Sequence, residues 1–294
     1  MAIEKFKPEV WAAKFMEDLD KKLVFKENCN HSYEGDARKP GDGVRILGLG
    51  EIDLGEWHDG KLHTLGTPQE PSGSSIYMPI NEIRYFNFTI DDLDQAQAQG
   101  GSGLLAKYIE KAKNAMAERM DSFIGKMHVG NCDTAFATPV QVSADGATGT
   151  KAILDVIDEA YLKLLENNVS RDSKITLTAP PWFIMMLKRA YVELDTDNSA
   201  MLNNGRVGRY SGIELKESNN VFHTMETVSS NQKDVFHIQL KTDEALAFVN
   251  PYTHIEGCRP SEGFADIAKG YTLFDGMPVA PKQCIDINVF KWEV

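Results

Sequence analysis

The chain has 294 residues, with 31 lysines and arginines against 43 aspartates and glutamates, so its formal net charge is −12. This acidic balance argues against a protein that binds nucleic acid by neutralising phosphates, because such domains are usually basic. Hydrophobic residues at 42% and charged residues at 25% exclude a disordered or fibrous chain. No apolar run approaches the roughly 20 residues of a membrane span, and the N-terminus lacks the pattern of a signal peptide. We expect a soluble protein that is made in the cytosol.

The N-terminal residues are expected to form an arm outside the main body. Apolar residues recur at helical spacing from Phe6 to about Phe25, and a polar, glycine-rich stretch follows from Asn28 to Gly43. We expect the helix to lie on the arm and not in the core. A chain that lacks residues 1–30 should therefore still fold but assemble poorly.

Residues 44–90 are expected to form a long two-stranded excursion. Val44–Leu47 and Ile83–Phe88 are rich in β-branched and aromatic residues, which is typical of strands. Glycine, proline, serine and histidine dominate the residues between them, which indicates a flexible tip. Because a lone hairpin is only marginally stable in water, this one needs a surface to lie on, either its own body or a neighbouring subunit.

Helical patterns dominate the middle of the chain. Acidic residues at Asp91–Asp94 suit a helix start. The clearest helix, Leu104–Lys126, has a single apolar stripe and would be about 35 Å long at about 1.5 Å per residue, so we expect it to lie across something broad. After a linker at Gly130–Gly149, helices are expected at Thr150–Asn167 and Trp182–Val192.

The second half of the chain is expected to alternate strands and loops. Ile175–Thr178 and Ile213–Lys216 alternate as strands, and Asp195–Gly212 forms a polar loop between them. The remaining residues, Val221–Val294, are expected to form short strands with one helical turn near Phe264–Lys269.

Loop motifs for nucleotides and calcium are incomplete. Gly41-Asp42-Gly43 and Gly48-Leu49-Gly50 both lack the third glycine of a dinucleotide loop. Asp195–Ser199 resembles the start of an EF-hand, but Ala200 replaces the glycine and Arg206 stands where a bidentate acid is needed. We expect a solvated acidic loop.

Isolated histidines and cysteines give no stronger indication of chemistry. His58 and His63 are five residues apart without further ligands, and His223 and His237 are expected to be ordinary core or surface histidines. The four cysteines are far apart along the chain and are expected to be buried thiols rather than disulfides. The sequence therefore predicts no catalytic, cofactor-binding or metal-binding residue.

Three stretches, together with the order of the elements, carry a resemblance to a known family. The first comprises Lys7–Trp11, Val24–Phe25, Asn30–Gly35 and Pro40–Val44, the second is Phe86–Gln95, and the third runs from Ile153 through Leu165–Val169, Pro180 and Leu187 to Gly205–Ile213 and Glu217–Val221. In this order they resemble the major capsid proteins of tailed bacteriophages. The resemblance implies the α+β Hong Kong 97-type capsid fold, which encapsulins share.

The resemblance also implies a division of the chain. It consists of an N-terminal arm (1–40), an extended loop (41–90), a peripheral domain with a spine helix (91–145 and 241–294) and an axial α/β domain (146–240). In such proteins the arm and loop reach over neighbouring subunits, and head-to-tail contacts close into pentamers, hexamers and an icosahedral shell. The Asn203–Ser211 loop would then lie near the capsomer axis.

The function implied is that of a structural capsid protein and not an enzyme. Its shell would enclose double-stranded phage DNA without sequence-specific binding, in a virion that is assembled in the bacterial cytoplasm. Because the arm begins within the first ten residues, we expect a separate scaffolding protein, besides portal and head-decoration or completion proteins. Some relatives form crosslinks from a lysine in the extended loop; Lys61 lies near the expected tip, and we do not expect it to react.

Three alternatives remain open from the sequence. The first is an encapsulin nanocompartment, which would enclose an enzyme instead of a genome. The second is a tail or head-completion protein. The third, an α/β hydrolase or a metalloenzyme, would need a nucleophile, base and orienting residue that lie together.

Overall fold

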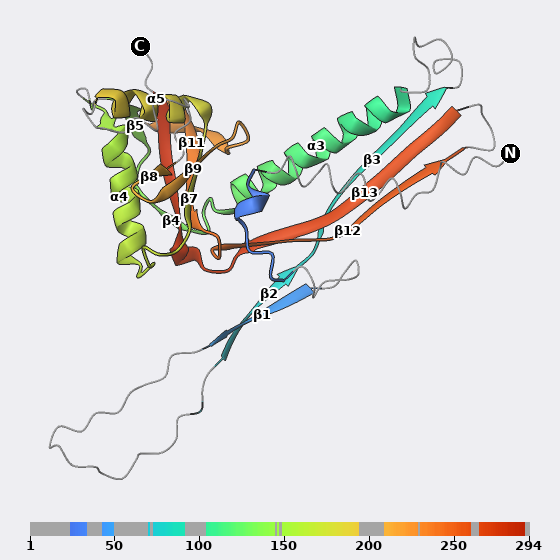
Figure 1. Cartoon of the computed structure of the whole chain (residues 1–294), viewed down its shortest axis with the longest axis horizontal. Coiled ribbons are helices and arrows are strands. Elements are labelled where there is room, and N and C mark those ends of the chain that lie inside the picture. Colours follow the sequence, from blue (N-terminus) through green and yellow to red (C-terminus); the bar gives the residue numbers. More distant parts are fainter. Residues whose placement is uncertain are drawn as a thin grey trace.

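Two β-sheets and a separate two-stranded ribbon organise the chain in the computed structural model (Figure 1). The structure describes residues 24–33, 43–49, 70, 73–91, 104–144, 146, 149–193, 209–228, 230–259 and 265–291. Within these residues, no helix combines the length and the apolar character that a membrane crossing requires.

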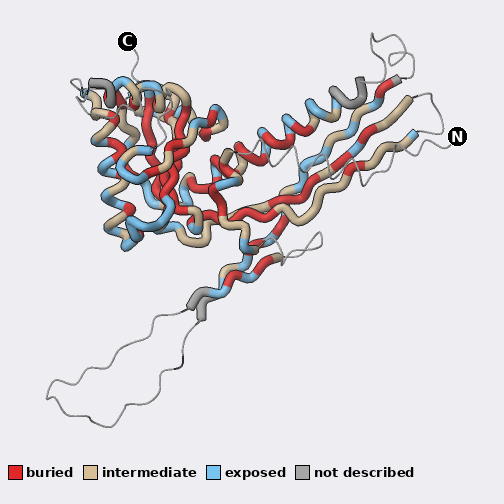
Figure 2. The backbone as a smooth tube through the Cα atoms, viewed as in Figure 1, coloured by how far each residue is buried: buried red, intermediate tan, exposed pale blue. Residues whose placement is uncertain are grey.

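The larger sheet has nine strands in the order β6-β5-β14-β11-β7-β9-β8, with β10 beside β11 and β4 beside β14. Its strands are β4 (Asp133–Thr134), β5 (Val140–Ser143), β6 (Lys151–Ala152), β7 (Ile175–Ala179), β8 (Arg209–Tyr210), β9 (Ile213–Glu217), β10 (His223–Val228), β11 (Asn231–Thr242) and β14 (Cys284–Lys291). Helices α4 (Ile153–Glu166) and α5 (Pro181–Glu193) pack against each other, and α4 also contacts β14 and β5. Apolar residues of both helices and of the central strands form the main core together with buried residues from the second half of helix Leu104–Met127; the buried stretches are red in Figure 2.

An elongated unit extends from this sheet (Figure 1). It combines a three-stranded antiparallel sheet, in the order β12 (Leu246–Cys258), β13 (Ala265–Pro278) and β3 (Glu82–Asp91), with helix α3 (Leu104–Met127) along it. Phe88 packs against Tyr108 of the helix, and Ile90 and Ala268 pack against Ile109. Because side chains alternate along a strand, the odd-numbered residues of β3 lie on the face away from α3.

The ribbon pairs β1 (Gly43–Leu49) with β2 (Gly73–Pro79) in antiparallel register and projects away from both sheets (Figure 1). One face of the ribbon is buried where it meets the body. Val44, Ile46 and Met78 pack there against Ala247 and Leu273 of β12 and β13.

Several elements expected from the sequence are confirmed. The helices α3, α4 and α5 and the strands β1, β3, β7 and β9 lie within a few residues of the expected ranges. Helix α3 lies across β13 and β3, as its single apolar stripe predicts.

Three expectations about strands are wrong. The partner of Val44–Leu47 is β2, which was not expected, whereas Ile83–Phe88 lies in β3 and pairs with β13. The segment Gly130–Gly149 is not a plain linker, since it contains β4 and β5. After Val221 the strands are long, and residues 265–269 continue β13 instead of forming a helical turn.

The N-terminal segment also differs from the expectation of an arm outside the core. Residues 24–33 form a turn and a short 3-10 helix, η1 (Lys26–Asn28), and Phe25 is a fully buried member of the main core. A deletion of residues 1–30 would therefore remove part of the core. The expected helix between residues 6 and 23 lies outside the described residues.

The two ranges expected for the peripheral domain, 91–145 and 241–294, contain strands of both sheets. β4 and β5 precede residue 145, and β14 follows residue 241, yet all three strands belong to the nine-stranded sheet. Of the described elements, α3, β12, β13 and β3 form the elongated unit.

Candidate interaction surface

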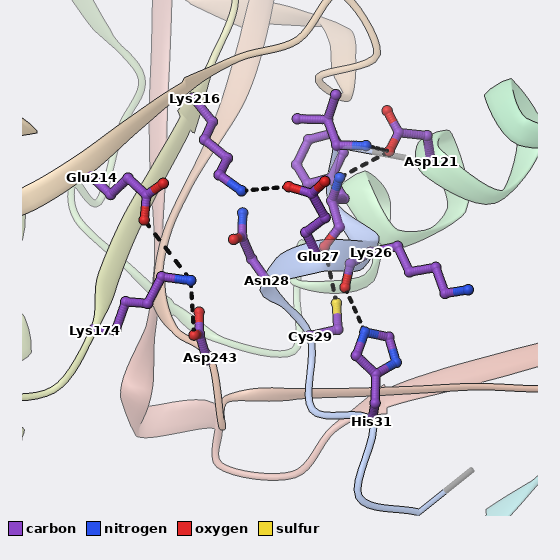
Figure 3. A network of polar contacts seen from close by, with 12 residues as sticks. Lys26, Glu27, Asn28, Cys29, His31, Asp121, Lys174, Glu214, Lys216 and Asp243 are labelled. Atoms are coloured by element: carbon purple, nitrogen blue, oxygen red, sulfur yellow. Dashed lines mark hydrogen bonds and ion pairs between the residues drawn. The ribbon is translucent and has the colours of Figure 1, made fainter. Parts of the chain in front are cut away.

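Polar contacts fix the N-terminal segment to the body (Figure 3). On helix α3, Asp121 accepts hydrogen bonds through Oδ1 from the backbone N–H groups of Val24 (3.0 Å) and Phe25 (2.9 Å). Its Oδ2 accepts from Asn220 Nδ2 at 3.1 Å and from Ser218 Oγ at 3.5 Å. Burial raises the pKa of Asp121, although the four hydrogen bonds oppose the shift.

Two lysines of the nine-stranded sheet contact the same segment, and Figure 3 shows one of them, Lys216. Lys216 forms an ion pair with Glu27 at 2.9 Å. The buried Lys241 donates to the carbonyl of Asn28, and its Nζ lies 3.8 Å from Cys29 Sγ. Asn30 then forms a parallel bridge with Ala247. Whatever precedes residue 24 therefore starts from a fixed point between α3 and β12.

The outer face of the ribbon exposes large apolar side chains. Leu47 of β1 is 80% exposed and Tyr77 of β2 is 55% exposed. Large side chains stabilise a sheet chiefly by packing together, and within the described part of the chain Leu47 and Tyr77 remain largely exposed. This face is suited to a second polypeptide.

The face of the three-stranded sheet that points away from α3 has the same character. Tyr85 is 80% exposed and Ile83 is 52% exposed. Beside them Tyr252, His254 and Tyr271 form a cluster of rings whose centroids are 5.7–6.1 Å apart. A shallow groove of about 330 Å³ runs along this face, lined by Tyr85, Phe86, Asn87, His254, Glu256, Lys269, Gly270 and Tyr271.

The ribbon and the three-stranded sheet both have edge strands, each paired with one neighbouring strand within the described part of the chain. These edge strands are β1 and β2 in the ribbon, and β3 and β12 in the three-stranded sheet. Exposed edges together with clustered exposed aromatic residues mark sites where proteins associate. We define the ribbon face (Leu47, Tyr77) and the outer sheet face (Ile83, Tyr85, Tyr271) as the candidate interaction surface.

A buried ionisable cluster lies at the junction of α3 with the large sheet. Asp286 of β14 lies between His237 (Nδ1 to Oδ2, 2.8 Å) and His128 (Nε2 to Oδ1, 3.3 Å). Burial alone would raise the pKa of Asp286 and lower that of His237. Interactions with His128 and His237 outweigh burial for Asp286, whose pKa is lowered, and interactions with Asp286 and Glu226 outweigh it for His237, whose pKa is raised. On its other side, His128 Nδ1 lies 3.1 Å from Gln239 Nε2.

This cluster indicates a structural role. All three side chains are nearly inaccessible to solvent, and within the part of the chain that the structure describes, no group of three or more histidine, cysteine, aspartate or glutamate residues could hold a metal ion. His237 is thus the core histidine that was expected, whereas His223 is exposed and pairs with Asp234 at 2.8 Å. Sequence reasoning missed the cluster because its members come from three distant elements.

Most of the positions discussed for the sequence motifs lie outside the described residues. This holds for His58, Lys61 and His63, for Asp92 and Asp94, and for residues 194–208, which include the EF-hand-like segment; Asp91 is the last residue of β3. Of the loop at Asn203–Ser211, Arg209 and Tyr210 form β8, and Ser211 and Gly212 turn the chain into β9 with positive φ angles of 48° and 89°. The four cysteines are free, and Cys29 and Cys284 are buried, whereas Cys132 and Cys258 are half-buried.

Comparison by sequence finds no matching family and no matching curated protein. Comparison of the structure finds capsids. The chain is similar to a structure from Mycobacterium phage Che8 (TM-score 0.71, 21% identity, 90% of each chain covered) and to the capsid of cyanophage P-SCSP1u (TM-score 0.69, 13% identity, 92% of this chain and 89% of the other). It is also similar to a virus-like particle from Pyrococcus furiosus (TM-score 0.53, 11% identity, 97% of this chain and 100% of the other). The chain therefore has the Hong Kong 97-type capsid fold over nearly its whole length.

Proposed function

We propose that this chain is the major capsid protein of a tailed bacteriophage. Copies of it assemble through pentamers and hexamers into an icosahedral shell that encloses double-stranded DNA. The observation that carries the proposal is a capsid fold whose ribbon and outer sheet face leave large apolar side chains exposed in the single chain. The role is structural and not catalytic.

Each part of the fold has a place in this proposal. The nine-stranded sheet with α4 and α5 belongs to the axial domain, the three-stranded sheet with α3 belongs to the peripheral domain, and the ribbon of β1 and β2 belongs to the extended loop. The ribbon face packs on a neighbouring subunit, as does the outer sheet face. Burial of a large apolar side chain contributes about 1.5–3 kcal/mol, and a closed ring repeats this contribution at every subunit contact.

Further components follow from the same proposal. A separate scaffolding protein directs assembly in the bacterial cytoplasm, and portal and head-decoration or completion proteins finish the virion. The net charge of −12 suits a shell that encloses DNA without binding its phosphates. The arm before residue 24 and the extended loop contact neighbouring subunits.

Negative-stain electron microscopy and light scattering of the purified chain test the proposal. We expect capsomer rings or closed shells when a scaffolding protein is co-expressed, and uniform shells from the chain alone would exclude a separate scaffolding protein. Leu47→Asp and Tyr85→Asp should reduce assembly at least tenfold while the circular dichroism spectrum stays unchanged, because each places a charge in an apolar contact. The matched controls Leu47→Met and Tyr85→Phe, which keep the apolar area, should assemble normally.

The same particles distinguish the proposed function from a nanocompartment. Double-stranded DNA in shells from infected cells supports the phage capsid, whereas a co-purified enzyme and no DNA would indicate an encapsulin-like shell. Failure to assemble with the scaffolding protein present would refute both.

A further inference from the structure

Two cysteines that are distant in the sequence occupy neighbouring positions in the fold. Cys132 lies in the turn after α3, and Cys284 is the first residue of β14. Strands β4 and β14 are parallel, with Asp133 opposite Ile285 and Thr134 opposite Asp286. Each cysteine comes one residue before this ladder, so the register places them side by side. Neighbouring strands lie about 4.8 Å apart, within the span of about 4.4–6.8 Å between the Cα atoms of a disulfide.

The two side chains also share one environment. Cys132 packs as a half-buried residue against the core that contains the fully buried Cys284, and the two thiols are close enough to interact. Burial raises the pKa of the Cys284 thiol, the contact with Cys132 raises it further, and Lys241 opposes the shift. Because Cys132 is the less buried of the two, it is the thiol that an oxidant reaches first.

The other two cysteines have different neighbours. The Cys29 thiol donates to the carbonyl of Phe25 at 3.3 Å. Cys258, near the end of β12, stands opposite Ile267. Cys258 is half-buried like Cys132, which makes it a matched control for the effect of accessibility alone.

We propose that Cys132 and Cys284 are a modification site at which an intrachain disulfide forms under oxidising conditions and ties the end of α3 to β14. With glutathione disulfide as the oxidant, the Cys132 thiolate attacks one sulfur of the oxidant and releases a glutathione thiol. The Cys284 thiolate then attacks the Cys132 sulfur and releases the second glutathione thiol. Two protein thiols and one glutathione disulfide thus give one protein disulfide and two molecules of glutathione.

Exposure of the chain to an oxidising medium rests on the proposed function, whereas the chemistry of disulfide formation does not. Cytosolic thiols stay reduced, whereas a particle released from a cell meets an oxidising medium. The free chain carries the same pair of thiols whether or not it assembles. A failure of shell assembly and a failure of disulfide formation would therefore be separate results.

The test uses the full chain, purified in reductant and then incubated under native conditions with glutathione disulfide. We expect the number of free thiols, titrated after denaturation, to fall from four to two per chain, with a mass loss of about 2 Da for the two hydrogens removed. Tryptic mapping should show residues 127–151 linked to residues 283–291, and dithiothreitol should restore all four thiols.

Variants separate this pair from general thiol oxidation. Cys258→Ser should keep the linked peptide, whereas Cys132→Ser and Cys284→Ala should each abolish it. Because Cys284 is buried, the half-buried Cys132 provides the variant that leaves the core intact. A stable glutathione adduct on Cys132, a link that involves Cys29 or Cys258, or four unreacted thiols in the folded chain would each overturn the proposal.

Discussion

Replacing Asp121 should loosen the N-terminal segment at Val24 and Phe25 while the sheets stay folded. The carboxylate is the acceptor for the N–H groups of Val24 and Phe25, and it also binds Asn220 and Ser218. In Asp121→Ala these donors lose their acceptor. The affected contact joins residues that are 96 positions apart in the chain, so local structure cannot replace it.

The expected loss follows from the environment of each donor. The Phe25 N–H group is buried and that of Val24 is partly buried, and an unsatisfied buried donor costs about 1–3 kcal/mol. The raised pKa of Asp121 shows that its charge is itself unfavourable in the folded state, and the alanine variant removes that penalty. We therefore expect a net loss of about 2–3 kcal/mol.

Asp121→Asn is the matched control. Its amide keeps an acceptor oxygen for Val24 and Phe25 and removes the buried charge, so it should lose less than about 1 kcal/mol. Hydrogen exchange should show faster exchange at the Phe25 amide in the alanine variant only, and trypsin should cleave it faster after Lys26. If alanine and asparagine had equal effects, or if neither changed protection of this amide, Asp121 would not be the anchor that we describe.

Three other predictions concern the body. Gly276→Ala should destabilise the chain by about 1–3 kcal/mol in urea unfolding, because its Cβ would lie 2.7 Å from the Ala247 carbonyl oxygen; unchanged stability would mean that the backbone can move. The raised pKa of His237 means that its stabilising effect is complete below about pH 6.5 and is lost as the pH rises through the folded-state value; His237→Gln should flatten this part of the Tm profile, and an unaltered profile would contradict the assignment. Deletion of residues 1–30 should lower the unfolding free energy by about 3–5 kcal/mol, since it removes a core phenylalanine, whereas deletion of residues 1–23 should not; equal stability of the two truncated chains would refute this.

Elements with a strong local signal could be predicted from the sequence. The α3 pattern repeats over 24 residues, and α4 and α5 have equally local apolar faces. Strand β7 was expected from Ile175–Thr178, although all of its residues, threonines included, are buried. In each case the spacing of the apolar residues is sufficient to predict whether the segment is a helix or a strand.

Pairings between distant segments could not be predicted in the same way. Residues 83–88 have the composition of a strand whether they pair with β1 or with β13, and composition does not choose between partners. Phe25 and Asn28 lie where an apolar helical pattern gives way to a polar stretch, yet both are buried in the folded chain, where they contact Asp121 and Lys241. The sequence predicts an extended loop that contacts neighbouring subunits but not the residues of the contact. The exposure of Leu47 and Tyr85 depends on which face of each sheet is covered by the rest of the chain.

The docking of the N-terminal segment has a consequence for the time course of folding. Lys241 and Asn28 are 213 positions apart, and contacts of such long sequence separation form late because a large loop must close first. At about 5–20 residues per second, a ribosome needs roughly 10–40 s to synthesise the residues between them. A nascent chain therefore keeps its N-terminal segment undocked until most of the polypeptide has been made, and the anchored conformation becomes available only to chains that are nearly complete.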